Sequence, residues 1–138
     1  MSRLWFALVP ATILFGRAAT AQSRSTPCAD STTTKHGVYT TQQAMRGKDI
    51  YAGNCKSCHT PESHTGATFN ATWNHRALSE LYGYIRDRMP KNEPGSLSAE
   101  EYADVLAYLL RMNRMPTGRR ELPADSAVMK GIRIEIIK

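Results

Sequence analysis

The sequence predicts an all-α fold built as one small domain. Three segments carry apolar residues at the spacing of one helical face, and each has a recognisable start or stop signal. No alternation of strand and helix patterns points to a parallel sheet, and no internal repeat is visible. With 138 residues, the chain has room for one domain of this kind.

The N-terminal segment, residues 1–21, has the pattern of a signal peptide. Arg3 gives it a positive start, the run LWFALVPATILFG is almost entirely apolar, and residues 19–21 (ATA) form a small-residue cleavage signal. A bilayer span needs about 20 apolar residues, and this run is shorter. We therefore expect an exported protein with no membrane span once the segment is removed.

The rest of the chain divides into three parts by composition. Residues 22–39 are polar and rich in serine and threonine, and we expect a flexible arm there. Residues 40–118 hold the helical patterns, and residues 119–138 form a C-terminal extension that we expect to pack on the domain. Removing Arg3 and Arg17 with the signal peptide lowers the net charge from +6 to +4. This mild charge favours an acidic partner surface, but no dense basic block predicts nucleic-acid binding.

The first predicted helix begins near Thr40, which forms a capping-box pair with Gln43. Its buried face carries Ala44, Gly47 and Tyr51 at helical spacing.

The second predicted helix covers residues 78–88. It ends near Arg88, because Pro90 disfavours helical backbone at the residue before it. Its apolar residues repeat at i, i+3, i+4 and i+7: Leu78, Leu81, Tyr82 and Ile85.

The third predicted helix starts at Ser98, with Glu101 completing a capping box, and ends near Asn113. Its apolar stripe consists of Tyr102, Val105, Leu106, Leu109 and Met112. In the tail, isoleucines 132, 134 and 136 alternate as in a strand. No partner strand is apparent, so we expect a short extended segment laid over the helices.

The motif CKSCH, residues 55–59, carries the chemistry. Two cysteines three apart with a histidine after them indicate half of a zinc site, a redox disulfide or the attachment site of a c-type haem. A structural zinc site needs four ligands, usually in two pairs, and the other cysteine and histidines are not spaced as a second pair. A redox disulfide usually follows a strand, whereas this motif follows a predicted helix.

Haem attachment accounts for all three residues together. Cys55 and Cys58 each form a thioether with one vinyl group of the porphyrin, and His59 is then placed with its imidazole facing the iron. We therefore expect one covalently bound haem c, with three to four helices wrapped around it. Export to the periplasm agrees, because bacteria attach c-type haem outside the cytoplasm.

The segment NCKSCH, preceded by AMRGKDIYAG and followed by MPKNEPGSLSAEEYADVLAYLLRMN, resembles the bacterial class I cytochrome c domain. It is especially similar to single-haem periplasmic cytochromes and to cytochrome domains that work with quinoprotein dehydrogenases. The resemblance covers residues 40–118. It implies that His59 is the proximal iron ligand and Met89 the distal one, and that the first helix crosses the last where Gly47 lets the backbones approach. The segment TPESHTGATF departs from the family, in which a glycine directly follows the histidine.

Other residues compete for the distal position. Met115 has the same Arg–Met–Pro surroundings as Met89, but it follows the third helix, whose length of roughly 22 Å places it far from the distal face. His64 and His75 are alternatives that would give bis-histidine ligation. Cys28 has no intramolecular partner left, and we expect a free thiol there.

These features predict an electron-transfer protein and not an enzyme. We expect one electron to pass from a dehydrogenase, of the quinoprotein class, to a terminal oxidase or another redox protein. The alternatives are a haem-based sensor or enzyme with an open sixth coordination position, and a binding module without haem.

Overall fold

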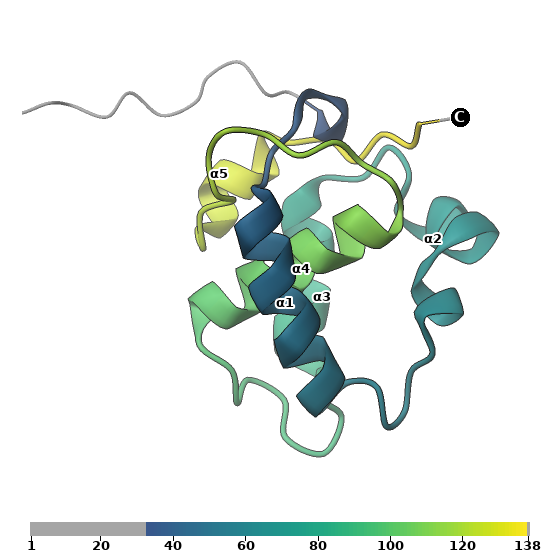
Figure 1. The fold of residues 1–138 in the computed structure, drawn as a ribbon, viewed down its shortest axis with the longest axis vertical. Coiled ribbons are helices and arrows are strands. Elements are labelled where there is room, and N and C mark those ends of the chain that lie inside the picture. The colour runs from purple at the N-terminus through teal and green to yellow at the C-terminus, as the bar shows by residue number, and fades with distance from the viewer. Residues whose placement is uncertain (1–32, 138) are drawn as a thin grey trace, which may run out of the picture.

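The computed structural model describes residues 33–137, which form a helical domain (Figure 1). The predicted signal peptide at residues 1–21 and Cys28 lie outside the described residues. The helices in chain order are the 3-10 helices and α-helices η1 (Thr34–His36), α1 (Thr41–Asn54), η2 (Pro61–His64), α2 (Gly66–Trp73), α3 (Leu78–Arg88), α4 (Ala99–Met112) and α5 (Ser126–Lys130). Residues 33–137 contain isolated β-bridges but no β-strand, so the predicted all-α fold is confirmed.

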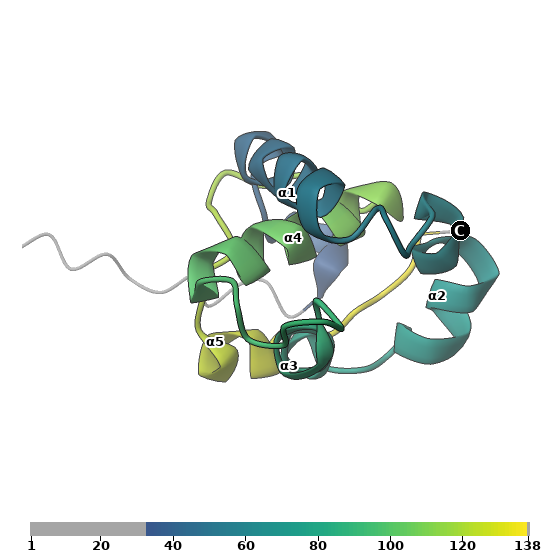
Figure 2. The same cartoon turned by 90° about the horizontal axis from the view of Figure 1, so that it is seen from below.

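The core lies between two pairs of helices. α1 packs chiefly on α4, and α3 packs on both α4 and α5. Figure 2 shows α1 and α4 on one side, α3 and α5 on the opposite side, and α2 beside them. The largest fully buried side chains are Tyr39, Leu78, Tyr82, Tyr102, Leu106, Leu110, Met129 and Ile134. Among the helices of residues 33–137, none is both long and apolar enough to cross a bilayer.

The crossing of α1 and α4 depends on Gly47. A Cβ atom at this position would lie 1.8 Å from the carbonyl oxygen of Asp104, so only glycine permits this approach of the two backbones. One turn further along, the rings of Tyr51 and Tyr108 pack with their centroids 5.4 Å apart. Next to Gly47 in α1, Arg46 makes two hydrogen bonds, of 2.8 and 2.9 Å, to the Asp104 carboxylate of α4. The predicted crossing of the first and last helices is therefore confirmed.

The predicted bounds of the second and third helices are also confirmed. α3 spans Leu78–Arg88, and α4 begins after Ser98 and ends before Asn113. Ser98 and Glu101 form the predicted capping box: the Glu101 N–H donates to the Ser98 hydroxyl (3.2 Å), and the Ser98 N–H donates to the Glu101 carboxylate (2.8 Å). These signals are readable in sequence because both partners lie within one turn.

The predicted capping box of α1 is half wrong. The Thr40 hydroxyl accepts from the Gln43 N–H (3.1 Å), as expected for an N-cap. The Gln43 side chain, only 2% exposed, does not return to Thr40. Its amide nitrogen donates to the Leu122 carbonyl (2.9 Å), and its amide oxygen accepts from the Leu122 N–H (2.7 Å). The buried backbone groups of Leu122 need hydrogen-bond partners, and the Gln43 side chain supplies them instead of completing the capping box.

Two helices, α2 and α5, were not expected. α2 is rich in threonine and asparagine, which are weak helix formers, and its one buried residue is Phe69. α5 has five residues, too few to show a period, and begins where the Asp125 carboxylate accepts from the Ala127 N–H (2.7 Å). Packing of Phe69 and Met129 holds these short segments in helical form.

The flexible arm predicted for residues 22–39 ends earlier than expected. Within residues 33–39, Thr34 and Tyr39 are fully buried. The Thr34 hydroxyl donates to the Glu135 carbonyl (3.1 Å) and accepts from the Glu135 N–H (3.0 Å). The Tyr39 hydroxyl donates to the Met115 carbonyl (2.6 Å). The polar composition of residues 22–39 gave no sign of this packing. The partners of Tyr39 and Thr34 lie 76 and 101 residues away in sequence, so no local pattern could indicate them.

The C-terminal segment is extended and lies over the helices, as predicted. Arg133 forms isolated bridges with Thr33 and with Ala77. Ile132 and Ile134 are buried and Ile136 is half-buried, which explains the alternation of apolar residues in this stretch.

Candidate cofactor site

The CKSCH motif starts where α1 ends. The Cys55 N–H still donates to the Tyr51 carbonyl (2.9 Å), as in the last turn of the helix. The chain then closes a tight turn in which the N–H groups of Cys58 and His59 both donate to the Cys55 carbonyl (3.1 and 3.0 Å). Both thiols are free, with Cys55 half-buried and Cys58 exposed, so the two cysteines do not form a disulfide in this structure. Burial raises the pKa of the Cys55 thiol.

A cavity of about 830 Å³ opens beside this turn, a volume within the usual range of small-molecule and cofactor sites. It is lined by Tyr51, Asn54, Cys55, Ser57, Cys58, His59, His64, Phe69, Trp73, Leu81, Tyr84, Ile85, Met89, Pro90, Lys91, Asn92, Val105 and Leu109. The four residues predicted from sequence to hold haem, Cys55, Cys58, His59 and Met89, are all among them. The fold therefore brings together residues from two segments about 30 positions apart in sequence.

The chemistry of the lining fits haem. Its walls are largely apolar and aromatic, as a porphyrin face requires, and include Phe69, Leu81, Ile85 and Leu109. Two thiols, an imidazole and a thioether line the same space, and these are the groups that attach and ligate haem c.

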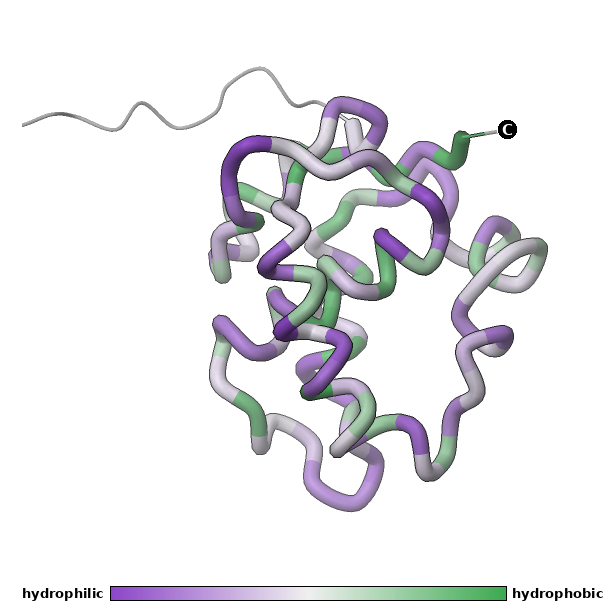
Figure 3. The backbone as a smooth tube through the Cα atoms, in the orientation of Figure 1, coloured by the Kyte–Doolittle hydropathy of each residue, from purple (hydrophilic) through white to green (hydrophobic). Residues whose placement is uncertain are grey.

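Met89 reaches the cavity from the end of α3. Its backbone is extended, and its N–H donates to the Ile85 carbonyl (2.9 Å), the last bond of the helix. Its carbonyl accepts from the Tyr102 hydroxyl (2.7 Å), and Tyr102 is 1% exposed. The loop that follows is mostly polar (Figure 3). Met89 is thus fixed between one helix and a buried side chain of the next.

Met115 lies elsewhere, in the core. It is 3% exposed and is not among the lining residues of the cavity. The two Arg–Met–Pro segments are therefore alike in sequence but differ in position.

Of the two histidines considered as alternatives, His64 lines the cavity and His75 does not. The rings of His64 and His59 have their centroids 4.6 Å apart. Burial, and after it the nearby His59, lowers the pKa of the His64 imidazole. His75 contacts Asn74 on the surface and has positive φ.

Aromatic residues of α2 and α3 close one part of the cavity. Trp73 lines it and packs edge-on against Tyr84, with ring centroids 5.5 Å apart. The guanidinium of Arg76 lies over the Trp73 ring, 4.9 Å from its centre. The aromatic character of Trp73 predicts packing against the porphyrin or against the helix that follows it, and the contact with Tyr84 of α3 agrees with the second.

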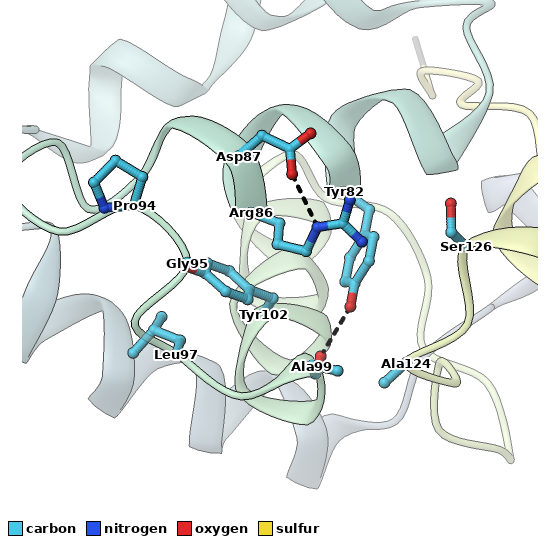
Figure 4. Close-up of a pocket in the computed structure, with 10 residues that line it drawn as sticks. All are labelled: Tyr82, Arg86, Asp87, Pro94, Gly95, Leu97, Ala99, Tyr102, Ala124 and Ser126. Atoms are coloured by element: carbon cyan, nitrogen blue, oxygen red, sulfur yellow. Dashed lines mark hydrogen bonds and ion pairs between the residues drawn. The ribbon is translucent and has the colours of Figure 1, made fainter.

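A second cavity, of about 490 Å³, shares no lining residue with the first (Figure 4). In its wall the Tyr82 hydroxyl donates to the Ala99 carbonyl (3.2 Å), and Arg86 pairs with Asp87 (2.9 Å). Tyr102 connects the two spaces, because its ring lines the second while its hydroxyl holds Met89 at the first.

Comparisons with known proteins agree with this site. Residues 42–109 match the family model described as cytochrome C oxidase, cbb3-type, subunit III. Comparisons with curated proteins and with solved structures gave no match. The matched segment runs from α1 through the CKSCH motif and Met89 to the last turn of α4, and so contains the whole cavity wall. Residues 42–109 therefore form a class I c-type cytochrome domain, which carries covalently bound haem c and serves haem-based electron transfer.

Proposed function

We propose that this protein is a monohaem electron carrier in which Cys55 and Cys58 hold haem c through thioether bonds while His59 and Met89 ligate the iron. The observation that carries the proposal is that all four side chains line one apolar cavity. Bound haem c supplies an iron that changes between the ferric and ferrous states by one electron.

The chain's own residues then have distinct tasks. The apolar walls exclude water, and a dry surrounding together with His/Met ligation favours the ferrous state relative to bis-histidine ligation. Tyr102 holds the Met89 backbone in place through its hydrogen bond of 2.7 Å. With His59 and Met89 both ligating the iron, no position would be left on it for a substrate, so the proposed role is that of a carrier and not of an enzyme.

The proposed partners are redox proteins that dock at the open side of the cavity. Lys56, inside the motif, and Lys91, on the cavity rim, are both exposed. Such basic groups favour a brief encounter with an acidic surface. We propose a quinoprotein dehydrogenase as donor and a terminal oxidase as acceptor, both acting in the periplasm.

Optical spectroscopy of the purified protein tests the proposal. A pyridine haemochrome assay should show one haem c per chain. The ferric spectrum should be six-coordinate and low-spin with the weak red band of sulfur–iron ligation. A high-spin spectrum that shifts with carbon monoxide would instead establish a sensor or enzyme with an open position. If the assay gave no haemochrome signal, the proposal would be wrong and the alternative of a binding module without haem would stand.

The proposed location has its own test. N-terminal sequencing of the protein recovered from a periplasmic fraction should begin at Gln22, directly after the predicted cleavage signal. An N-terminus at Met1 would contradict both the signal peptide and the periplasmic location.

A further inference from the structure

An imidazole that ligates a metal through one ring nitrogen usually donates its other N–H to an acceptor, which fixes the ring and strengthens the ligand. The segment after His59 departs from the family pattern, so this acceptor is not evident from sequence. We propose that His64 is a positioning residue for His59, and that its imidazole accepts the hydrogen bond of the His59 ring nitrogen that does not bind iron. The inference rests on the proposed ligation of iron by His59.

The geometry places the two imidazoles within reach of each other. Their centroids are 4.6 Å apart and their planes meet at 51°, so they are oblique and not stacked. Each ring nitrogen lies about 1.1 Å from its ring centre, and a small rotation of either ring therefore brings two nitrogens to a hydrogen-bond distance of about 3 Å. A neutral imidazole has one nitrogen that accepts, so His64 has the group that this bond requires.

The same distance argues against His64 as the second iron ligand. With metal–nitrogen bonds of about 2 Å, two imidazoles on opposite faces of one iron have their centres roughly 6 Å apart. The observed 4.6 Å is shorter than this, so His64 lies beside His59 and too close to it for the two rings to occupy opposite faces of one iron. Met89, which also lines the cavity, remains available as the second ligand.

His64 is held by the fold and does not belong to a freely solvated loop. The Asn113 side-chain nitrogen donates to the His64 carbonyl (2.9 Å) and also to the Leu109 carbonyl (2.9 Å) in the last turn of α4. Asn113 is 9% exposed, so this bond is sheltered from water. The His64 ring also meets Tyr51 edge-on, with centroids 6.0 Å apart. These contacts tie η2 to α1 and α4 and keep the His64 ring against His59.

The test compares reduction potentials of the holoprotein with His64→Ala and His64→Gln, using His75→Asn as a matched control. Loss of the acceptor weakens His59 as a donor to ferric iron, so the potential of His64→Ala should rise. We expect a shift of about tenfold in the ferrous-to-ferric equilibrium constant, which for one electron is about 59 mV. His64→Gln, whose amide oxygen can accept, should recover part of the shift. His75→Asn, on the surface, should match the wild type, because asparagine tolerates positive φ.

A second measurement needs no variant. In the ferrous wild-type holoprotein, the His59 ring N–H should give a nuclear Overhauser effect to a ring proton of His64, and its absence would overturn the inference. So would an unchanged potential in His64→Ala with the sulfur–iron band intact, an outcome that leaves the proposed function standing. A bis-histidine spectrum in the wild type that becomes high-spin in His64→Ala would overturn both this inference and ligation by Met89.

Discussion

At the scale of single residues, Met89 and Met115 have the same Arg–Met–Pro neighbours in sequence but lie in different environments. Met89 lines the cavity, whereas Met115 is buried in the core with its carbonyl bonded to Tyr39. We expect Met89→Ala to lose the sulfur–iron band, lower the reduction potential and open the iron to carbon monoxide. Met115→Ala should keep all three properties but lose about 2–5 kcal/mol of unfolding free energy, because it removes a buried side chain.

Optical spectra with and without carbon monoxide, together with guanidinium unfolding, separate the two variants. Each serves as the control for the other. Loss of the sulfur–iron band in Met115→Ala, with a normal spectrum in Met89→Ala, would reverse the assignment of the distal ligand.

At the scale of elements, the contact of α1 with α4 should tolerate no added atom at Gly47. Gly47→Ala places a Cβ within 1.8 Å of a backbone oxygen of α4, so the helices must separate. We expect a loss of about 3 kcal/mol or more in unfolding free energy. Gly53→Ala lies in the same helix, where an added Cβ meets nothing within 4 Å, and should leave stability unchanged or raise it by up to about 1 kcal/mol. Equal stabilities of the two variants in guanidinium unfolding would show that the helices do not cross this closely.

The link between α1 and the C-terminal extension gives a second prediction at this scale. Gln43→Ala leaves the N–H and carbonyl of Leu122 without their partners in a buried position. Each such group costs about 1–3 kcal/mol, so the variant should lose about 2 kcal/mol or more.

The control for Gln43→Ala is Gln42→Ala, its exposed neighbour in the same helix. This change should alter the unfolding free energy by no more than about 0.5 kcal/mol. Limited proteolysis should also cut Gln43→Ala faster near residue 122. Matching cleavage rates in the two variants would count against a role of Gln43 in holding the extension.

At the scale of the whole molecule, the cavity of about 830 Å³ adjoins a small core. A domain of this size buries a modest fraction of its surface by itself, and side chains such as Phe69 and Leu109 lie both in the core and on the cavity wall. We expect the double change Cys55→Ala with Cys58→Ala, which removes the thioether bonds, to give a largely unfolded chain. Cys28→Ser, outside the motif, should fold as the wild type does.

Circular dichroism during heating tests this prediction. The double variant should show weak helical signal and no cooperative transition. A cooperative transition with helical signal close to the wild type would mean that the helices hold together without the covalent group.

The features that the sequence determined by itself are those whose signals lie within one or two turns of chain. The bounds of α3 and α4 follow from Pro90, from the Ser98–Glu101 capping box and from apolar spacing. The CKSCH motif limits the chemistry to a zinc half-site, a redox disulfide or haem attachment, and the lack of a second ligand pair or of a preceding strand pattern favours haem. The four residues expected to attach haem or ligate its iron, Cys55, Cys58, His59 and Met89, were therefore predictable, and all four line the cavity.

Only the tertiary structure decided the features whose partners are distant in sequence. Gln43 bonds a residue 79 positions away, and Thr34 one 101 positions away, so neither the lost capping box nor the packing of residues 33–39 had a local signal. The short helix α2 is stabilised by burial of Phe69 and not by its own composition. His64 comes to His59 because Asn113, 49 residues further along, holds its backbone. In each case the stabilising free energy comes from hydrogen bonds to buried polar groups or from burial of apolar surface between distant segments. No single stretch of chain reveals these contacts.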